Sequence, residues 1–263
     1  MEIKASQVKE LRDMTGVAMM ECKKALIEAE GDLEKAVDLL RSNSALKAEK
    51  KSSRVAADGI LVSTLTNDYA TILEINTETD FAAKDSSFLS FAEKVKTYIT
   101  ENKVTDISSL EDSSLEEERK TLIQTIGENI QLRRIETISF TSEMKKGLYM
   151  HFDSKLAAIV ITKDGSDEVA RNIAMHVSAF NPLCLSEDDI DKDVLERKKA
   201  IFVNQAKESG KPQEIMDKMV EGKVKRFLSE VSLLSQDFVR LKVGEGIEVE
   251  TKDFAEEVAE QLK

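Results

Sequence analysis

Few residues in this chain have the type and spacing needed for catalysis. The histidines His151 and His176 fall in a strand-like and a helix-like run, and neither has a cysteine or second histidine at metal-ligand spacing. Cys22 and Cys184 are predicted to be small buried side chains rather than nucleophiles. The sequence has no GxxxxGK[ST] phosphate loop and no dinucleotide fingerprint. These patterns argue against a conventional enzyme, and we expect no cofactor and no metal.

The segment Glu78-Thr79-Asp80-Phe81 places an acid beside a bulky aromatic, between a strand-like run and a helix-like run. In one interpretation Asp80 caps the following helix and Phe81 packs into the core. In the other, an exposed Phe81 wedges into a partner's pocket while Asp80 competes for the partner's polar groups. Residue chemistry alone favours the first interpretation.

The adjacent pair Met19-Met20 presents a similar choice. Neighbouring residues on a helix are about 100° apart, so we expect one methionine in the core and the other exposed. Flexible thioethers also suit docking of a helix on another surface, although core packing is the simpler explanation.

Composition sets broad limits on the class of protein. The length of 263 residues predicts one large or two to three small domains. The net charge of −12 disfavours broad binding to nucleic acid or anionic lipid. Two prolines and 5% aromatic residues favour helices. Two cysteines suit a reducing compartment, and we find neither a signal peptide nor an apolar run of about 20 residues. We therefore expect a cytoplasmic protein.

The first part of the chain is predicted to form three short helices. The first begins at Ser6 as N-cap and ends at Gly16, the second covers 19–30, and Asp32 caps the third. The basic stretch 44–59 is predicted to be an exposed helical linker.

Beyond the linker, the period of apolar residues changes to that of strands. Residues 56–140 contain two β-branched runs with a hairpin turn at Asn67-Asp68, two helices and a further strand. Two more strands around Asp153-Ser154 and a helix at 167–180 form a second mixed unit. The repeated order of strand, strand and helix suggests an internal duplication.

Residues 186–231 are two charged helical runs joined at Gly210–Pro212, and each carries a narrow apolar stripe. This pattern predicts a protruding antiparallel helical hairpin. The expected fold class is α+β, with small antiparallel sheets and helices in a two-subdomain core. The expected parts are a helical module with its linker at 1–55, a core N-subdomain at 56–140, a core C-subdomain at 141–185 and 232–252, the hairpin at 186–231, and a C-terminal helix module at 253–263.

Several long motifs occur in one order along nearly the whole chain. They include TGVAMMECKKALIEAEGDLEKAVDLLR, INTETDFAAKDSSF, IGENIQLRRI, IAMHVSAFNPLCL and MVEGKVKRFLSEVSLLSQDFV. In these motifs the sequence resembles the bacterial elongation factor Ts family. The resemblance implies a guanine-nucleotide exchange factor for elongation factor Tu that is not itself an enzyme. It also implies that the N-terminal module is ubiquitin-associated-like.

The resemblance carries over to two groups of residues. Those that match docking positions for the partner's G domain are Arg12, Met19 and Met20. Those that match the loop near the partner's magnesium site are Thr79, Asp80, Phe81 and Ala82. A homo-oligomer is left open, because the hairpin and the sheet edges can both dimerise.

In one place the chain departs from the family pattern. The family continues after SQDFV with a Pro-containing turn and a helix, whereas here Val239 is followed directly by Arg240 and the strand-like run RLKVGEGIEVE. The resemblance places the missing segment in the second core subdomain and its partner surface.

Two other classes of function remain open on the residues alone. One is a non-catalytic adaptor that binds a partner through the N-terminal module. The other is a metal-dependent hydrolase using Glu78, Asp80 and Asp85, which requires that the isolated chain bind a divalent metal. A local basic cluster, Lys223-Val224-Lys225-Arg226, is not expected to bind tRNA strongly in so acidic a chain.

Overall fold

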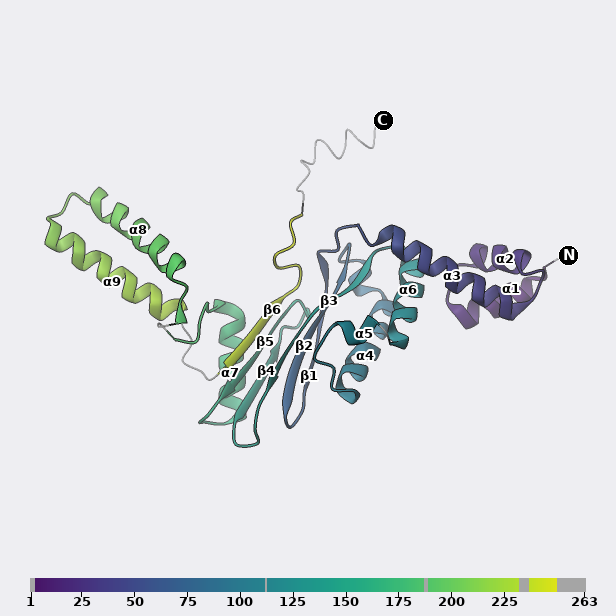
Figure 1. The fold of residues 1–263 in the computed structure, drawn as a ribbon, viewed down its shortest axis with the longest axis horizontal. Helices are drawn as coiled ribbons and strands as arrows, with labels where there is room; N and C mark the ends of the chain where they lie inside the picture. Colours follow the sequence, from purple (N-terminus) through teal and green to yellow (C-terminus); the bar gives the residue numbers. More distant parts are fainter. Residues whose placement is uncertain (1–2, 112, 187–188, 232–236, 250–263) are drawn as a thin grey trace, which may run out of the picture. The chain divides into compact units, whose positions relative to one another are not determined.

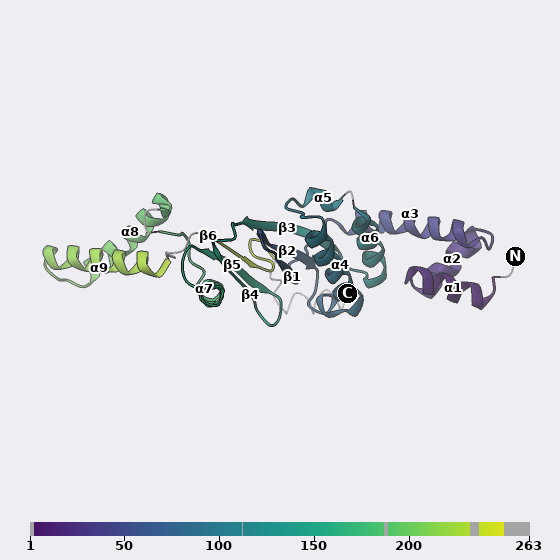
Figure 2. The same cartoon turned by 90° about the horizontal axis from the view of Figure 1, so that it is seen from below.

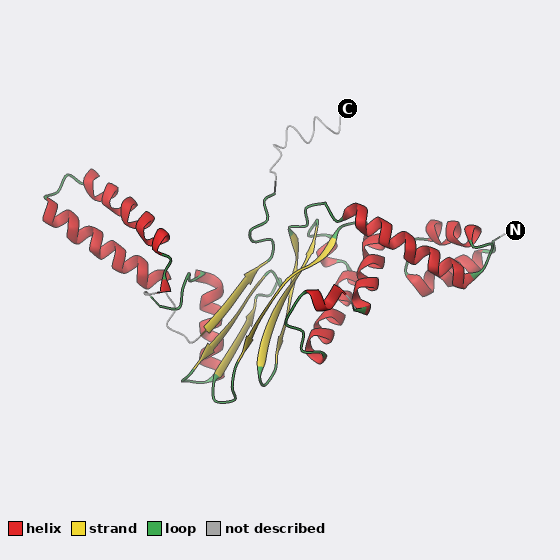
Figure 3. Cartoon of the chain, in the orientation of Figure 1, coloured by secondary structure: helices red, strands yellow, loops and turns green. Residues whose placement is uncertain are grey.

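A computed structural model describes residues 3–111, 113–186, 189–231 and 237–249, and it combines helices with two small three-stranded sheets (Figures 1 and 3). The helices are α1 Ala5–Thr15, α2 Met19–Glu28, α3 Leu33–Lys51, η1 Ala82–Lys84, α4 Ser86–Glu101, α5 Ser108–Glu111, α6 Ser114–Ile126, α7 Asp167–Phe180, α8 Lys192–Glu208 and α9 Gln213–Val231. The strands are β1 Asp58–Leu65, β2 Tyr69–Thr77, β3 Ile130–Ser139, β4 Lys145–Met150, β5 Leu156–Thr162 and β6 Asp237–Lys242. The predicted α+β class is confirmed.

The chain divides into two compact units. The first is built from the described residues of Met1–Thr64, Leu73–Ile135 and Lys242–Lys263, and the second from those of Leu65–Ile72 and Glu136–Leu241. The finer division into five parts stays a prediction. No helix in the described ranges is both long and apolar enough to cross a bilayer.

The three N-terminal helices share one small core, as predicted, that includes Leu11, Cys22 and Leu40. Ser6 is not the N-cap of α1, so that prediction was wrong. The helix starts after Lys4, whose backbone amide donates to the Gln7 side chain at 3.2 Å. This bond satisfies an amide at the start of the helix two residues earlier than expected. The ubiquitin-associated-like character of the module stays a prediction.

Helix α3 begins where predicted, because the Asp32 side chain accepts a hydrogen bond from the Lys35 amide at 3.1 Å. The stretch 44–59 was predicted to be an exposed helical linker; the helical part is confirmed as far as Lys51, but full exposure was wrong. The helix continues unbroken to Lys51, and its second half buries Ser44 and Ala48 against α6. Ser44 and Ala48 lie four residues apart and so share one helix face. Because both side chains are small and the serine is polar, the apolar pattern of the sequence did not identify this face as buried.

The first sheet has the order β1-β2-β3, and the predicted β1–β2 turn is confirmed by a hydrogen bond from the Thr66 amide to the Tyr69 carbonyl at 2.9 Å. Strand β2 is buried along its whole length. Leu73 and Ile75 of this strand pack in one core with Phe88 of α4 and Ile123 of α6. The first of the two helices predicted within 56–140 is therefore α4, and its apolar face forms part of this core.

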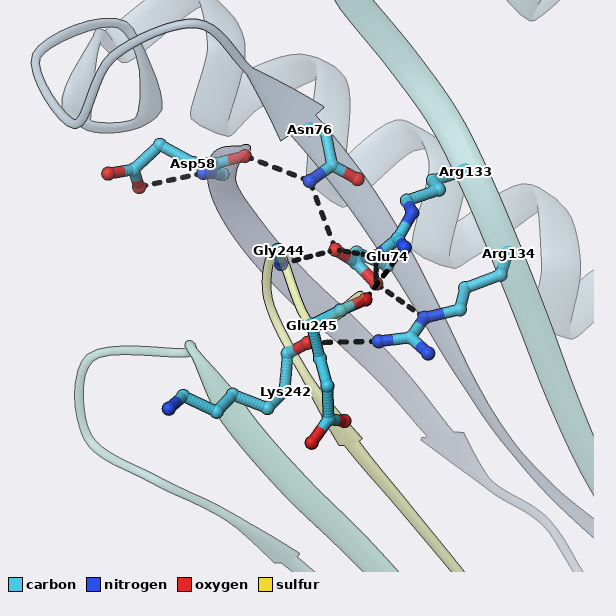
Figure 4. A network of polar contacts seen from close by, with 9 residues as sticks. Asp58, Glu74, Asn76, Arg133, Arg134, Lys242, Gly244 and Glu245 are labelled. Carbon is cyan, nitrogen blue, oxygen red and sulfur yellow. Dashed lines mark hydrogen bonds and ion pairs between the residues drawn. The ribbon is translucent and has the colours of Figure 1, made fainter. Parts of the chain in front are cut away.

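A polar network in the same unit surrounds the buried carboxylate of Glu74 of β2, as Figure 4 shows. The Glu74 carboxylate accepts hydrogen bonds from Arg133 at 3.1 Å, Arg134 at 2.6 Å and the Gly244 amide at 2.8 Å. The two arginines also donate to the carbonyls of Glu245 and Lys242. Burial alone would raise the pKa of Glu74, but hydrogen bonds from Gly244, Arg134 and Asn76, together with the Arg134 charge, lower it below its ordinary value.

In the second unit, β5 lies between β4 and β6. Strands β4 and β5 are antiparallel, with Lys145 opposite Thr162 and Met150 opposite Ala157. Helix α7 covers this sheet closely, because a Cβ on Gly147 of β4 would lie 2.1 Å from the Ala170 backbone. The helix ends at Asn181 in the left-handed conformation, which confirms the predicted stop.

Helices α8 and α9 form the predicted antiparallel hairpin and lie side by side in Figures 1 and 2. The rings of Phe202 and Phe227 pack edge to face between the two helices, with their centroids 6.3 Å apart. The last predicted strand begins and ends earlier than expected, as β6, since the chain turns at Gly244. Val239 and Arg240, the point of the shortened segment, both lie inside this continuous strand. The predicted helix at 253–263 lies outside the described residues.

Candidate functional site

The loop between β2 and α4 presents Phe81 to solvent, with 81% of the residue's surface exposed. The interpretation in which Phe81 packs into the core was therefore wrong. The next two residues, Ala82 and Ala83, are buried and form the start of the short helix η1. The loop is thus anchored by small side chains while its one large apolar side chain faces outward.

Asp80 does not cap α4, so this part of the prediction was also wrong. The cap is Asp85, whose carboxylate accepts hydrogen bonds from the amides of Ser87 at 2.8 Å and Phe88 at 3.4 Å. Asp80 instead forms an ion pair with Lys84 at 2.6 Å. The hydrogen bond and the charge of Asp80 raise the pKa of Lys84. Residues 80–84 therefore carry a carboxylate, an exposed aromatic ring and an ammonium group.

A second loop, between α6 and β3, holds this segment in place. The Thr79 amide donates to Glu128 at 2.9 Å and the Thr79 hydroxyl to the same carboxylate at 2.7 Å. In return, the Asn129 amide donates to Glu78 at 2.6 Å. Sequence reasoning missed Glu128, although it lies in the quoted motif IGENIQLRRI, because its partner is 49 residues away in the chain.

At the N-terminal site, Met19 is 49% exposed and Met20 is 65% exposed. The expectation that one of them lies in the core was wrong. The nearby Val17 and Cys22, rather than either methionine, pack in the core of the N-terminal module. Arg12 is also exposed, and so is Met14, which sequence reasoning did not select. The described N-terminal module therefore presents thioether side chains and a guanidinium group to solvent.

An open cavity of about 790 Å³ lies in the same unit. It is lined by the end of α1 and by faces of α3, α4 and α6, including Met14, Arg41 and Lys94. No residue of the Glu78–Ala82 loop lines it. The loop therefore lies outside this cavity.

The remaining residues that could do chemistry are separated. Cys22 and Cys184 are buried, as predicted, and burial raises the pKa of the Cys22 thiol. His151 lies 3.2 Å from Asp153, while the His176 ring stacks on Phe180. Within the ranges the structure describes, no three His, Cys, Asp or Glu side chains are grouped so that they could hold a metal.

The three acids of the hydrolase hypothesis each have different partners. Glu78 accepts from the Asn129 amide and lies 3.4 Å from Arg54, Asp80 is paired with Lys84, and Asp85 caps α4. They do not form one cluster of metal ligands. The geometry therefore offers no support for that hypothesis.

Comparison with known proteins gives the family. The family model for elongation factor Ts matches residues 78–260. A protein named elongation factor Ts from Hahella chejuensis is 46% identical, with 99% of each chain covered. Proteins of the same name from Thioalkalivibrio sulfidiphilus and Psychrobacter arcticus are 41% and 42% identical, covering 100% and 98% of this chain and 99% and 96% of theirs. The chain belongs to the elongation factor Ts family.

As a member of the elongation factor Ts family, this chain is a translation elongation factor. The matched region begins at Glu78 and so includes the exposed loop, while the relatives are similar along the N-terminal module as well. The alignment with the Hahella protein extends over 285 positions, more than the 263 residues of this chain. That relative therefore has residues that this chain lacks, in keeping with the expected shortening.

Proposed function

We propose that this chain binds elongation factor Tu in its GDP form and promotes GDP release and GTP rebinding by intruding near the magnesium and nucleotide site. One observation carries the proposal: Phe81 is 81% exposed on a loop whose backbone is held by a neighbouring loop. Membership of the elongation factor Ts family supplies the class of partner.

The proposed action follows from how a GTPase holds its nucleotide. Backbone amides and a lysine bind the phosphates, and Mg²⁺ bridges them. A protein that binds the nucleotide-free state more tightly shifts the equilibrium toward that state. Phe81 would act as the wedge that displaces elements supporting the metal. The Asp80 carboxylate would compete for hydrogen bonds that hold the partner's loop.

Such exchange requires no covalent step in this chain. The coupling is reciprocal, so nucleotide rebinding expels the exchange factor. The chain is then not an enzyme but a protein that acts on a GTPase. It works in the cytoplasm, where its partner carries aminoacyl-tRNA.

The N-terminal module supplies the docking surface in this proposal. Arg12, Met19 and Met20 are all exposed. Exposed thioethers adapt to an apolar surface, and a guanidinium can pair with a carboxylate of the partner. Docking through these residues would bring the separate Thr79–Ala82 loop to its target with less loss of entropy.

The test is release of a fluorescent GDP analogue from elongation factor Tu in excess unlabelled GDP. Release should accelerate with the concentration of this protein, and the Asp80→Ala/Phe81→Ala variant should lose most of that acceleration. Phe180→Ala, which removes another exposed phenylalanine, is the matched control and should behave as wild type. A folded wild-type protein that leaves the release rate unchanged would refute the proposal.

A non-catalytic adaptor is the second candidate, and the exposed Met14, Met19 and Met20 favour it. An adaptor would bind its partner through these residues without using Phe81. The same experiment separates the two, because an adaptor does not change the rate of GDP release.

A further inference from the structure

Glu78 and Glu128 lie in two neighbouring loops, and each accepts a hydrogen bond from the backbone amide of the residue that follows the other. Glu78, in the loop after β2, accepts a hydrogen bond from the Asn129 amide at 2.6 Å. Glu128, in the loop after α6, accepts from the Thr79 amide at 2.9 Å and the Thr79 hydroxyl at 2.7 Å. The arrangement is reciprocal, because each loop provides one carboxylate and one backbone amide to the other.

The loop that bears Glu128 is itself firmly anchored. The buried Asn129 side chain donates to the carbonyls of Ser52 at 3.4 Å and Arg54 at 2.8 Å. Gly127 ends α6 in the left-handed conformation, with φ of 90°, and so sets the direction in which the chain leaves the helix. Glu128 therefore acts from a fixed point on the molecule.

Thr79 passes this constraint to the turn that bears Phe81. Its hydroxyl donates to Glu128 and accepts from the Ala82 amide at 3.3 Å, which uses the group as donor and acceptor. Its carbonyl accepts from the Thr77 hydroxyl at 2.8 Å and the Ala83 amide at 3.2 Å. The backbone on both sides of Phe81 is thus set by hydrogen bonds of Thr79.

An exposed ring needs such an arrangement, because packing in the core cannot hold it. A loop that sampled many conformations would have only a fraction of its molecules ready to insert Phe81. Hydrogen bonds to a carboxylate are stronger than those between neutral groups, so Glu128 is well suited to raise that fraction.

We propose that Glu128 is a positioning residue for nucleotide exchange: it presets the Thr79–Ala82 turn so that Phe81 projects toward the partner. This inference rests on the proposed function. Glu128 acts through Thr79, so its effect on the exchange rate should depend on the presence of the Phe81 ring.

The first measurement concerns the isolated protein. Amide hydrogen exchange of the segment 77–84 should quicken by about tenfold or more in Glu128→Ala, and by less in Glu128→Gln, which keeps one acceptor oxygen. Glu118→Gln is the matched control, because Glu118 of α6 also forms a close contact, to Lys94 at 2.6 Å. Unchanged protection of segment 77–84 in Glu128→Ala would overturn the proposal.

The second measurement is GDP release from elongation factor Tu at saturating concentrations of each variant. Glu128→Ala should lower the accelerated rate by about tenfold, Glu128→Gln by less, and Glu118→Gln should match wild type. In a Phe81→Ala background, the further change Glu128→Ala should have no additional effect. An additive loss would mean that Glu128 acts on the partner directly, and would overturn the positioning role.

The two measurements separate this proposal from the function on which it rests. If wild type fails to accelerate release, the exchange function fails, and the positioning role in exchange fails with it. If wild type accelerates release and Glu128→Ala does so equally well, only the positioning role is refuted. Thermal melting of each variant shows whether it is folded, and Glu128→Gln serves if Glu128→Ala is not.

Discussion

The Lys84 Nζ atom lies 2.6 Å from Asp80 Oδ2, and these two residues lie on either side of the exposed Phe81 in the chain. In the free protein, therefore, the carboxylate proposed to compete for the partner's hydrogen bonds is already paired. The hydrogen bond and charge of Asp80 raise the pKa of Lys84, so the lysine stays charged at neutral pH. The lysine's side of this linkage is fully present below the unfolded pKa of lysine and is lost as pH rises through the higher folded value.

Replacing Lys84 by Gln should release the Asp80 carboxylate without harm to the fold. The side chain is largely exposed, and surface ion pairs contribute little to stability, so the melting temperature should not change. Accelerated GDP release at subsaturating concentrations should rise by about twofold, because Asp80 no longer has to leave a partner. Slower release would show that Lys84 itself takes part in binding.

Phe81→Ala should separate function from stability. The exposed ring contributes little to the fold, so the free energy of unfolding should change by no more than about 0.5 kcal/mol. Accelerated GDP release should fall by at least about tenfold, because the proposed wedge is gone.

Phe88→Ala, seven residues further along the chain, is the contrasting variant. Phe88 is fully buried in the core of the first unit, so this change should cost about 3–5 kcal/mol of stability. Denaturant unfolding measures both variants. If Phe81→Ala were as destabilising as Phe88→Ala, the ring would have to pack in solution, contrary to the structure.

The elements with clear periodicity could be predicted from sequence. The apolar residues of α4 recur on one face, and that face packs in the core, while the β-branched runs of β1 and β2 are typical of strands. Helix boundaries that depend on a single contact were harder to predict from sequence. The start of α1 depends on one hydrogen bond between Gln7 and Lys4, which apolar periodicity does not report.

The candidate site was predicted only in part. Its residues were found through family motifs, but residue type alone favoured a buried Phe81, because large aromatic side chains are usually buried. The loop that carries this ring is joined to a second loop by the long-range bond between Thr79 and Glu128, which apolar periodicity does not report. The buried face of the second half of α3 was missed for a related reason: its packing residues, Ser44 and Ala48, are too small to mark a core face, and Ser44 is polar.

Glu74→Gln should destabilise the first unit at neutral pH. Removing the charge leaves Arg133 and Arg134 without their buried counter-ion, at a cost of about 2–3 kcal/mol, since Gln keeps part of the hydrogen bonding. The folded pKa of Glu74 lies below its ordinary value, so its stabilising effect is complete above about pH 4.3 and is lost as pH falls through the folded pKa.

The difference between wild type and Glu74→Gln should therefore narrow at acidic pH. Urea unfolding at pH 7 and at a series of values below pH 4 measures it. Glu136→Gln, an exposed change on β3, should match wild type throughout. Equal stability of wild type and Glu74→Gln at pH 7 would count against the buried network.

Gly244→Ala should be strongly destabilising. A Cβ there would lie 2.2 Å from the Ala57 carbonyl oxygen, and φ is 73°, so the change adds a steric clash to an unfavourable backbone conformation. We expect a loss of about 3 kcal/mol or more. Gly210→Ala shares a positive φ, of 63°, but meets nothing within 4 Å, and should cost about 1 kcal/mol. Denaturant unfolding compares the two, and similar losses would show that the Gly244 segment does not lie against Ala57.

Met20→Asp tests the docking surface of the N-terminal module. Because Met20 is 65% exposed, the melting temperature should stay the same. The affinity of the Met20→Asp variant for elongation factor Tu in the GDP form should fall by about tenfold or more, because the new charge would have to be desolvated in the proposed interface. Met175→Asp introduces the same change at an exposed methionine of α7 and should bind as wild type. Titration calorimetry measures both affinities, and equal losses in the two variants would mean that added negative charge, rather than the Met20 surface, weakens binding.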